Sequence, residues 1–248
     1  MIKASVLVQS YNCNDTLPNT LYSISRQKTN FDFEVCFLDD CSYEDPKPIY
    51  DEFLNVKYKK GWRLKQHIGS LGDSRNFPHM IWFKNSFAMA LDMIDKNSEI
   101  IIFHHGDILT IDDNVFQKFV DRVNNKEPQI PNVYTVNVPN DLYLHYEDIK
   151  NFEINEEHTP LYQGVNRCSL APTLMALTKH DVYELEYDKN THECNIAILM
   201  KQYNYKLVAP GDIIGIHQLH KYRPSAHIVN EGCLLNWTSD CPEKVIYQ

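Results

Sequence analysis

Acidic and aromatic side chains follow two apolar runs near the N-terminus. Asp39 and Asp40 come directly after one run, and Ser10 and Tyr11 end an earlier one. In an open α/β sheet, ligands bind at the carboxyl ends of the strands. Carboxylates there can accept hydrogen bonds from a ribose or a base, and Tyr11 offers a stacking face. In the simpler alternative, the two aspartates only cap the turn that follows.

A second set of chemically capable residues follows the very apolar run 99–103. Asp107, with His104 or His105 and the distant His217, could hold a divalent ion. Hard ions prefer oxygen ligands, and imidazole suits zinc better than manganese. Two alternatives stay open: adjacent histidines at a strand end are often only hydrogen-bonded polar residues, or no metal binds and a cationic side chain does its work.

The elements that must position these residues alternate between strand and helix in the first half of the chain. This alternation predicts a mostly parallel sheet with helices on both faces. Apolar runs predict strands at 4–9, 33–38, 56–64 and 99–103, and helical spacing predicts helices from Asp15 or Thr16 to about Gln27, from Pro46, and from about His79 to Asp95.

The second half of the chain is less regular. Strands are predicted at 133–138, 174–178, 206–209 and 213–217, and a helix at 190–203. Asn204 follows that helix at a position where a left-handed residue is expected. The acidic segment 140–160 is predicted to form an excursion over a site.

Composition narrows the class of protein. The chain has 248 residues and a net charge of −9, which argues against general binding to nucleic acid or to an anionic membrane. Its seven cysteines form no Cys-x-x-Cys pair, which indicates reduced thiols rather than a disulfide framework. With neither a long apolar run nor a basic-apolar leader, we expect a soluble cytoplasmic protein without a transmembrane segment.

Five segments, in order and spacing, resemble the GT-A glycosyltransferases, and family 2 in particular. They are Ser5–Asn12, Phe37–Ser42, Phe83–Ala90, Ile100–Leu109 and Thr191–Ile216. The resemblance implies an α/β, Rossmann-like GT-A fold with a mostly parallel, mixed central sheet. It also implies a single catalytic domain over 1–220, with a nucleotide-binding half (1–110), an acceptor half (111–220) and a C-terminal tail (221–248).

The same resemblance implies a nucleotide site at the first two strand ends. It places Ser10 and Tyr11 beside the base, and Asp39 as the acceptor for uracil or ribose. Asp40 joins this set. Lys84 takes the place of the family's arginine near the donor phosphates, and Arg75, after a glycine-containing loop, is a second possibility.

The family's metal motif, Asp-x-Asp, is altered in this chain. His105 and Gly106 precede the one remaining acidic residue, Asp107. The resemblance still implies Mn²⁺ or Mg²⁺ at Asp107, with His105 and His217 as further ligands. Glu193 aligns with the catalytic base of the inverting members, where it would take a proton from the acceptor hydroxyl.

The predicted reaction is transfer of a hexose or N-acetylhexosamine from a nucleoside diphosphate sugar, UDP-linked, to a hydroxyl of a glycan or other acceptor, with inversion. One alternative is a catalytically silent module that binds a sugar nucleotide or a glycan, supported by the altered Asp-x-Asp. Another is a sugar-phosphate nucleotidyltransferase. Such enzymes carry a basic, glycine-rich loop after the first strand, whereas residues 10–14 contain neither glycine nor a basic residue.

Overall fold

The computed structural model describes the greater part of the N-terminal half and several shorter stretches further along. The described residues are 2–39, 42–53, 56–60, 63–64, 92–127, 132–145, 159–162, 174–184, 204, 214–220 and 234–235.

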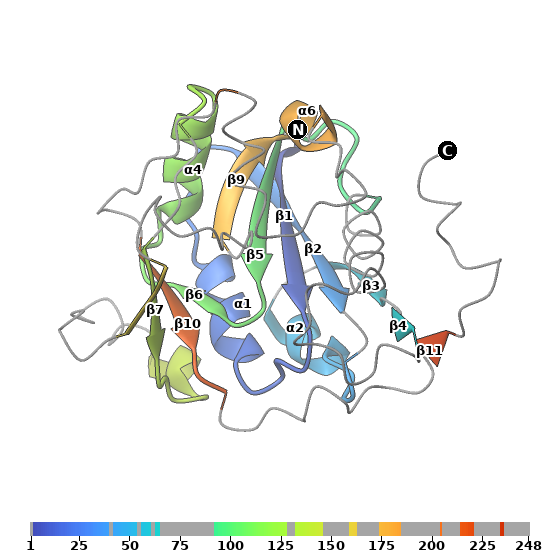
Figure 1. The fold of residues 1–248 in the computed structure, drawn as a ribbon, viewed down its shortest axis with the longest axis vertical. Helices are drawn as coiled ribbons and strands as arrows, with labels where there is room; N and C mark the ends of the chain where they lie inside the picture. Colours follow the sequence, from blue (N-terminus) through green and yellow to red (C-terminus); the bar gives the residue numbers. More distant parts are fainter. Residues whose placement is uncertain are drawn as a thin grey trace.

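A five-stranded sheet lies at the centre of the fold (Figure 1). Its strands are β1 (Ile2–Ser10), β2 (Asp32–Asp39), β3 (Val56–Lys60), β5 (Ile100–His105) and β9 (Leu174–Thr178). They lie in the order β3-β2-β1-β5-β9. The first four run parallel to their neighbours, and β9 pairs antiparallel with β5. The sheet is therefore mixed and mostly parallel, as predicted.

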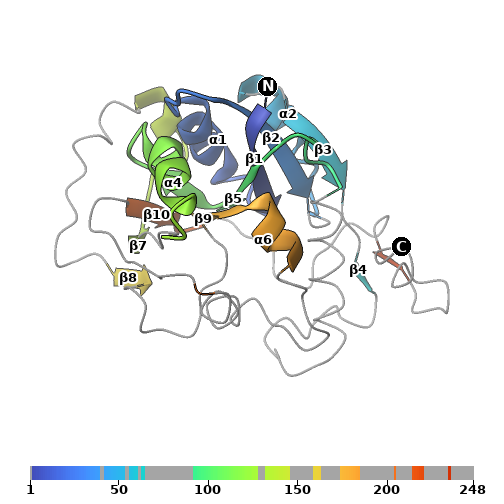
Figure 2. The ribbon, with the colours of Figure 1, turned by 90° about the horizontal axis from the view of Figure 1, so that it is seen from above.

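Helices cover this sheet. They are α1 (Leu17–Ser25), α2 (Lys47–Phe53), α4 (Val115–Val123) and α6 (Lys179–Glu184), with a short 3₁₀ turn, η2, at Leu142–His145. Figure 2 shows α1 and α2 on one side of the sheet and α6 on the other. Among the described residues, no helix has the length and apolar character needed to cross a bilayer.

The main hydrophobic core lies between one face of the sheet and the helices α1 and α4. Alternate residues of β1 face these helices, because successive side chains of a strand point to opposite sides. Ala4, Val6 and Val8 are fully buried there, against Leu21 of α1 and Phe116 of α4. This packing holds the strand ends, and therefore the loops that follow them, in fixed positions.

A second sheet continues from the end of β5. Its strands are β6 (Ile108–Thr110), β7 (Asn132–Val136), β8 (Thr159–Tyr162) and β10 (Ile214–Gln218), in the order β6-β10-β7-β8. A two-stranded pair joins β4 (Arg63–Leu64) to β11 (Leu234–Leu235). The second sheet brings the end of β10 beside the turn between β5 and β6, because Gln218 donates its backbone N–H to the carbonyl of Asp107 at 2.9 Å.

Most predicted strands are found within a residue or two of their expected bounds, and Asn204 has the expected positive φ of 62°. Two predictions need correction. The strand predicted at 56–64 is divided into β3 and β4, which pair with different partners. The helix predicted to reach Asp95 does not include residues 92–95, which form a turn. There Asp95 accepts the backbone N–H of Asn97 at 2.7 Å, a local bond that competes with helix formation.

Helices α4 and α6 were not predicted. The helix predicted at 190–203, the strand at 206–209 and most of the excursion at 140–160 lie outside the described residues.

Candidate functional site

The site lies at β1, where the chain stops adding strands to one side of the sheet and begins to add them to the other. Strand β1 has β2 on one side and β5 on the other, so the order in which strands are added to the sheet reverses at β1. Such a switch point opens the crevice in which α/β proteins bind ligands. Ser10 pairs with Asp39 at the ends of β1 and β2, and Gln9 pairs with His105 on the other side.

A very close approach joins the ends of β1 and β5. A Cβ placed on Gly106 would lie 2.7 Å from the Oγ of Ser10 and 2.8 Å from its Cβ. Gly106 also donates its N–H to the carbonyl of Gln9 at 2.8 Å, and its own carbonyl accepts from the hydroxyl of Thr20 at 3.0 Å. The middle position of the altered metal motif therefore has room only for glycine.

The loops after β1 and β2 are tied together by hydrogen bonds. Asn12, with a left-handed φ of 50°, gives its N–H to the Oγ of Ser42 at 2.9 Å. Its side-chain oxygen accepts the N–H of Tyr43 at 2.8 Å. Asp39 accepts the N–H of Ser42 at 3.1 Å and is fully buried. The turn-capping role considered for Asp39 is thus present, while its role in binding a nucleotide stays a prediction.

Asp107 lies between two imidazoles. His217 and His220 each place Nε2 3.4 Å from its Oδ2. Asp107 is buried, and among the described residues its Oδ1 has no hydrogen-bond partner. Burial opposes ionisation of this carboxyl, but the bonds to the two imidazoles outweigh burial and hold its pKa well below the usual range. Asp107 is therefore a carboxylate with one oxygen still to be satisfied.

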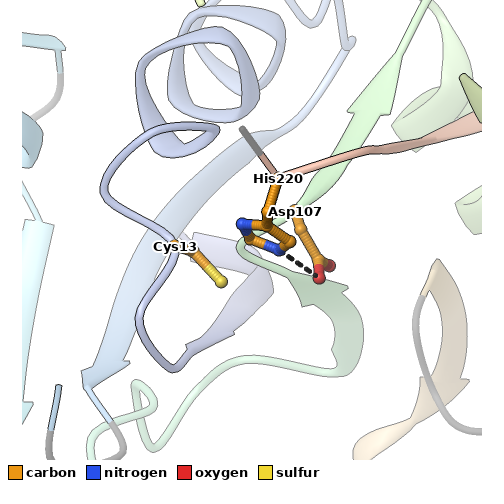
Figure 3. Close-up of side chains that lie close together, drawn as sticks. All are labelled: Cys13, Asp107 and His220. Carbon is orange, nitrogen blue, oxygen red and sulfur yellow. Dashed lines mark hydrogen bonds and ion pairs between the residues drawn. The ribbon is translucent and has the colours of Figure 1, made fainter. Parts of the chain in front are cut away.

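His220 is held from both sides. Its Nδ1 lies 2.8 Å from Oδ1 of Asp15, and its Nε2 faces Asp107 (Figure 3). Burial disfavours the charged ring, yet the hydrogen bonds to Asp107, Asp15 and Cys13 raise the pKa of His220 to about 11. Cys13, Asp107 and His220 each offer a ligand atom, and these atoms lie within 4.8 Å of one another. They form the group that we call the Cys13 cluster.

A buried polar network fixes the end of β10, which carries these histidines. The side-chain amide of Gln218 donates to the hydroxyl of Thr20 at 2.9 Å and accepts from Asn19 at 3.0 Å. Gln218 is 1% exposed, so breaking these bonds would leave buried polar groups without partners. The network therefore anchors β10 against α1 and keeps His217 next to Asp107.

The adjacent residues His104 and His105 at the end of β5 have different surroundings. His104 is buried, with its ring against Phe116, and its Nδ1 lies 2.8 Å from the carbonyl of His105. Burial lowers its pKa to about 4. His105 is half-buried on the opposite face, and its charge helps to lower the pKa of Asp107. Asp107 acts on the charge of His104 as well, so the choice between His104 and His105 as a partner of Asp107 stays a prediction.

The predicted site residues are brought together only in part. Ser10, Tyr11 and Asp39 lie at adjacent strand ends, and Asp107 meets His217. Four predicted residues lie outside the described part of the chain: Asp40, Arg75, Lys84 and Glu193.

Sequence reasoning missed Cys13, Asp15 and His220. The available signals were the Cys13-x-Asp15 pair after the first strand and the spacing of His217 and His220. Neither signal indicates that the two segments meet.

The donor atoms around Asp107 suit a metal ion. A buried carboxylate oxygen without a partner in the described structure and nearby imidazole nitrogens are groups that divalent transition metals bind. Mg²⁺ and Ca²⁺ prefer sites made of oxygen alone. The residues therefore fit a transition-metal ion better than Mg²⁺.

Comparisons with known proteins find similarity to glycosyltransferases. Residues 5–80 match the family model "Glycosyl transferase family 2". Over 120 residues the chain is 30% identical to poly(ribitol-phosphate) beta-N-acetylglucosaminyltransferase TarS of Staphylococcus aureus, covering 45% of this chain and 21% of TarS. It is 32% identical over 114 residues to chondroitin synthase of Escherichia coli, covering 45% of this chain and 16% of that protein. The matches thus span only a minor part of either relative.

Solved structures show the same fold over most of the chain. S. aureus TarS 1–349 in complex with UDP-GlcNAc superposes with a TM-score of 0.54 at 16% identity, covering 90% of this chain and 60% of that one. The mannosyltransferase PcManGT from Pyrobaculum calidifontis, in complex with GDP-Man and Mn²⁺, also gives a TM-score of 0.54, at 14% identity, with 88% and 57% covered. The chain therefore has the GT-A fold, and its N-terminal region carries the pattern of glycosyl transferase family 2.

Proposed function

We propose that this protein is a glycosyltransferase that moves a hexose or N-acetylhexosamine from a UDP-linked donor to a hydroxyl group of a glycan or similar acceptor. The observation that carries the proposal is the position of Asp107. This buried carboxylate lies beside two imidazoles at the switch point of a GT-A sheet. The family 2 match and the transferase names of the relatives support the same activity.

The donor nucleotide would lie over the ends of β1 and β2. Tyr11 would offer its ring to the base, and Ser10 and Asp39 would bind the uracil or ribose. The bonds between Asn12 and Ser42 support this placement, because they hold the two loops in one geometry before the donor arrives. Preorganisation of this kind lowers the entropy lost on binding. Asp40 would add acceptors at the same edge, and Lys84 and Arg75 would approach the phosphates.

Asp107 and His217 would hold a divalent ion, for which we predicted Mn²⁺ or Mg²⁺ with His105 as a further ligand. When bound, such an ion neutralises the charge of the donor diphosphate. His105 lies at the end of β5, near enough for its charge to act on Asp107. Gln218 supports this role by holding the end of β10 in place.

Glu193 would act as the general base in a direct displacement. Its carboxylate would take the proton of the acceptor hydroxyl while that oxygen bonds to the anomeric carbon. The bond between that carbon and the diphosphate oxygen breaks, and the nucleoside diphosphate leaves with the electron pair. Attack from the face opposite the leaving group inverts the anomeric configuration.

A panel of UDP- and GDP-sugars, measured for thermal stabilisation and for release of nucleotide with and without Mn²⁺, tests this proposal. A bound donor raises the melting temperature in proportion to the logarithm of its concentration relative to its Kd. We expect one UDP-sugar to stabilise the protein and to be turned over when acceptor is present. Stabilisation without any turnover across an acceptor panel would instead support a silent binding module. No stabilisation by any nucleotide would contradict both.

A further inference from the structure

Three different kinds of metal-binding atom lie close together beside Asp107. The Cys13 cluster contributes a thiol sulfur, a carboxylate oxygen and an imidazole nitrogen, all within 4.8 Å of one another (Figure 3). Cys13 belongs to the loop after β1, Asp107 to the turn after β5, and His220 to the segment after β10. Three parts of the chain that are distant in sequence therefore converge on one point.

Asp107 also carries a carboxylate oxygen that lacks a partner in the described structure. Asp107 is 7% exposed, and among the described residues its Oδ1 has no hydrogen-bond partner. A buried polar atom without a partner costs free energy, and in a native structure it calls for an explanation. A cation bound by both carboxylate oxygens of Asp107 would satisfy it. This observation is independent of the nearness of the three side chains.

Asp15 orients the imidazole for such an ion. Its carboxylate lies 2.8 Å from Nδ1 of His220, which leaves Nε2 as the nitrogen directed at Asp107. A carboxylate on the far nitrogen of a metal-binding histidine is the common supporting contact in such sites, because it fixes the ring and makes Nε2 more basic. Asp15 therefore has the position of a supporting residue rather than of a ligand.

We propose that Cys13, Asp107 and His220 bind the ion at Asp107, with Cys13 and His220 in the place of the predicted His105 and His217. This ligand set favours a borderline-soft divalent ion, such as Zn²⁺ or Co²⁺, over Mg²⁺. A thiolate selects such ions, whereas Mg²⁺ and Ca²⁺ avoid sulfur. Zinc bonds of about 2.0–2.2 Å to nitrogen and oxygen give a tetrahedral edge of about 3.3 Å. The 3.4 Å between Nε2 of His220 and Oδ2 of Asp107 is close to this edge.

Binding exchanges protons for metal bonds without any redox change. The thiol of Cys13 now donates to the carbonyl of Tyr11 at 3.2 Å. As the sulfur–metal bond forms, the thiol proton goes to solvent, and so does the Nε2 proton of His220. Three protein ligands leave one position of a tetrahedral ion open. That a donor phosphate oxygen takes this position rests on the proposed function, whereas binding of the ion does not.

Titration of the full chain with Co²⁺ in the absence of nucleotide tests the site. We expect saturable binding with visible absorption bands of tetrahedral Co²⁺ and a near-ultraviolet thiolate-to-cobalt band. Zn²⁺ should displace the Co²⁺, and a large excess of Mg²⁺ should not. A spectrum without the thiolate band, equal competition by Mg²⁺, or no binding would each overturn the proposal.

Variants locate the ligand sulfur. Cys13→Ser should remove the thiolate band, whereas Cys36→Ala should keep it, because Cys36 is buried in β2 outside the Cys13 cluster. Asp15→Ala should weaken Co²⁺ binding by about 10–100-fold, the usual effect of losing a supporting contact. A thiolate band that persists in folded Cys13→Ser, checked by circular dichroism, would overturn the assignment of Cys13.

The test of the metal site and the test of the proposed transferase function can fail independently of each other. UDP affinity is measured in a second titration on the metal-free protein and on the Zn²⁺-loaded protein. A thiolate–cobalt spectrum in a protein that binds no nucleotide would support the metal site and contradict the transferase. Nucleotide binding and turnover without the cobalt spectrum would support the transferase and contradict the metal site.

Discussion

Ser10 and Gly106 are packed so closely that a Cβ on Gly106 would lie 2.7 Å from the Ser10 hydroxyl oxygen. This contact joins the ends of β1 and β5 at the switch point of the sheet. It also gives a physical reason why the altered metal motif has glycine before Asp107. The cluster of Cys13, Asp107 and His220 depends on the position of this turn.

Gly106→Ala should destabilise the protein by about 1–3 kcal/mol, because the new methyl group overpacks a buried contact. For a chain of this size, each kcal/mol lowers the melting temperature by about 2–4 °C. Thermal unfolding measures the loss. In a Ser10→Gly background the same change should cost less, since the two nearest atoms, the Oγ and Cβ of Ser10 at 2.7 and 2.8 Å, are then absent.

Gly215→Ala is the matched control for this prediction. The three atoms nearest to its Cβ would be side-chain methyl groups, those of Leu174 at 3.2 Å, Val133 at 3.3 Å and Ile108 at 3.6 Å, so no contact is as close as the 2.7 Å at Gly106. A Gly106→Ala penalty that is no larger than that of Gly215→Ala, or that is unchanged by Ser10→Gly, would contradict the packing account.

Glu34 should make stability depend on pH. It accepts from the hydroxyl of Ser5 at 2.6 Å and from the N–H of Asp95 at 2.5 Å, and it pairs with Lys57 at 2.6 Å. Burial opposes its ionisation, but the bonds to Lys57, Ser5 and Asp95 prevail and lower its pKa below 4.5. The stabilisation that ionised Glu34 gives to the folded protein is therefore complete above the pKa of Glu34 in the unfolded chain. It is lost as the pH falls through the pKa of Glu34 in the folded protein.

We expect Glu34→Gln to lower the free energy of unfolding by about 1–3 kcal/mol at pH 7 and by clearly less at pH 3. Urea unfolding at the two pH values measures the difference. The exposed Glu52 of α2 provides the control Glu52→Gln, which should have little effect at either pH. A Glu34→Gln penalty that is the same at both pH values would show that ionisation of Glu34 has no part in it.

Ser42→Ala should weaken nucleotide binding through the loops after β1 and β2. The change leaves the buried N–H of Asn12 without its acceptor at 2.9 Å, so the two loops lose part of their fixed geometry. Loss of one such bond is worth about 1–3 kcal/mol, which corresponds to a fall in UDP affinity of up to about 100-fold. Calorimetry measures the affinity, and Ser25→Ala on the exposed side of α1 is the control. Equal UDP affinity in both variants would exclude a role for the hydrogen bond between Asn12 and Ser42 in nucleotide binding.

Glu193→Gln should lower the rate of sugar transfer by about 10²–10⁴-fold, because it keeps the shape of the side chain and removes the base. Donor affinity should change little, since this residue is predicted to contact the acceptor. Glu193 lies outside the described residues, so the kinetic experiment is the direct test. Transfer at the rate of the unmodified protein would remove Glu193 from the mechanism.

The positions of the strands along the sequence were predictable because each strand is an apolar run that ends at polar residues. This is why Ser10, Asp39 and Asp107 were correctly expected at strand ends. Helix α4 was missed, although Val115, Phe119 and Val123 have helical spacing and are buried. Its pattern is local and could have been found.

The environment of Asp107 was less predictable. His220 meets Asp15 across 205 positions of sequence, and no local pattern specifies that contact. The packing of β10 against β6 and α1 creates it.

The most direct test of the account is calorimetric titration of UDP into the protein and into Asp107→Asn, each with a saturating divalent ion and each with excess chelator. We predict that the ion strengthens UDP binding to the unmodified protein and that Asp107→Asn abolishes this gain while leaving the weaker, metal-free affinity in place. UDP affinity that is equal with ion and with chelator, or a gain that survives in Asp107→Asn, would contradict the central role of Asp107.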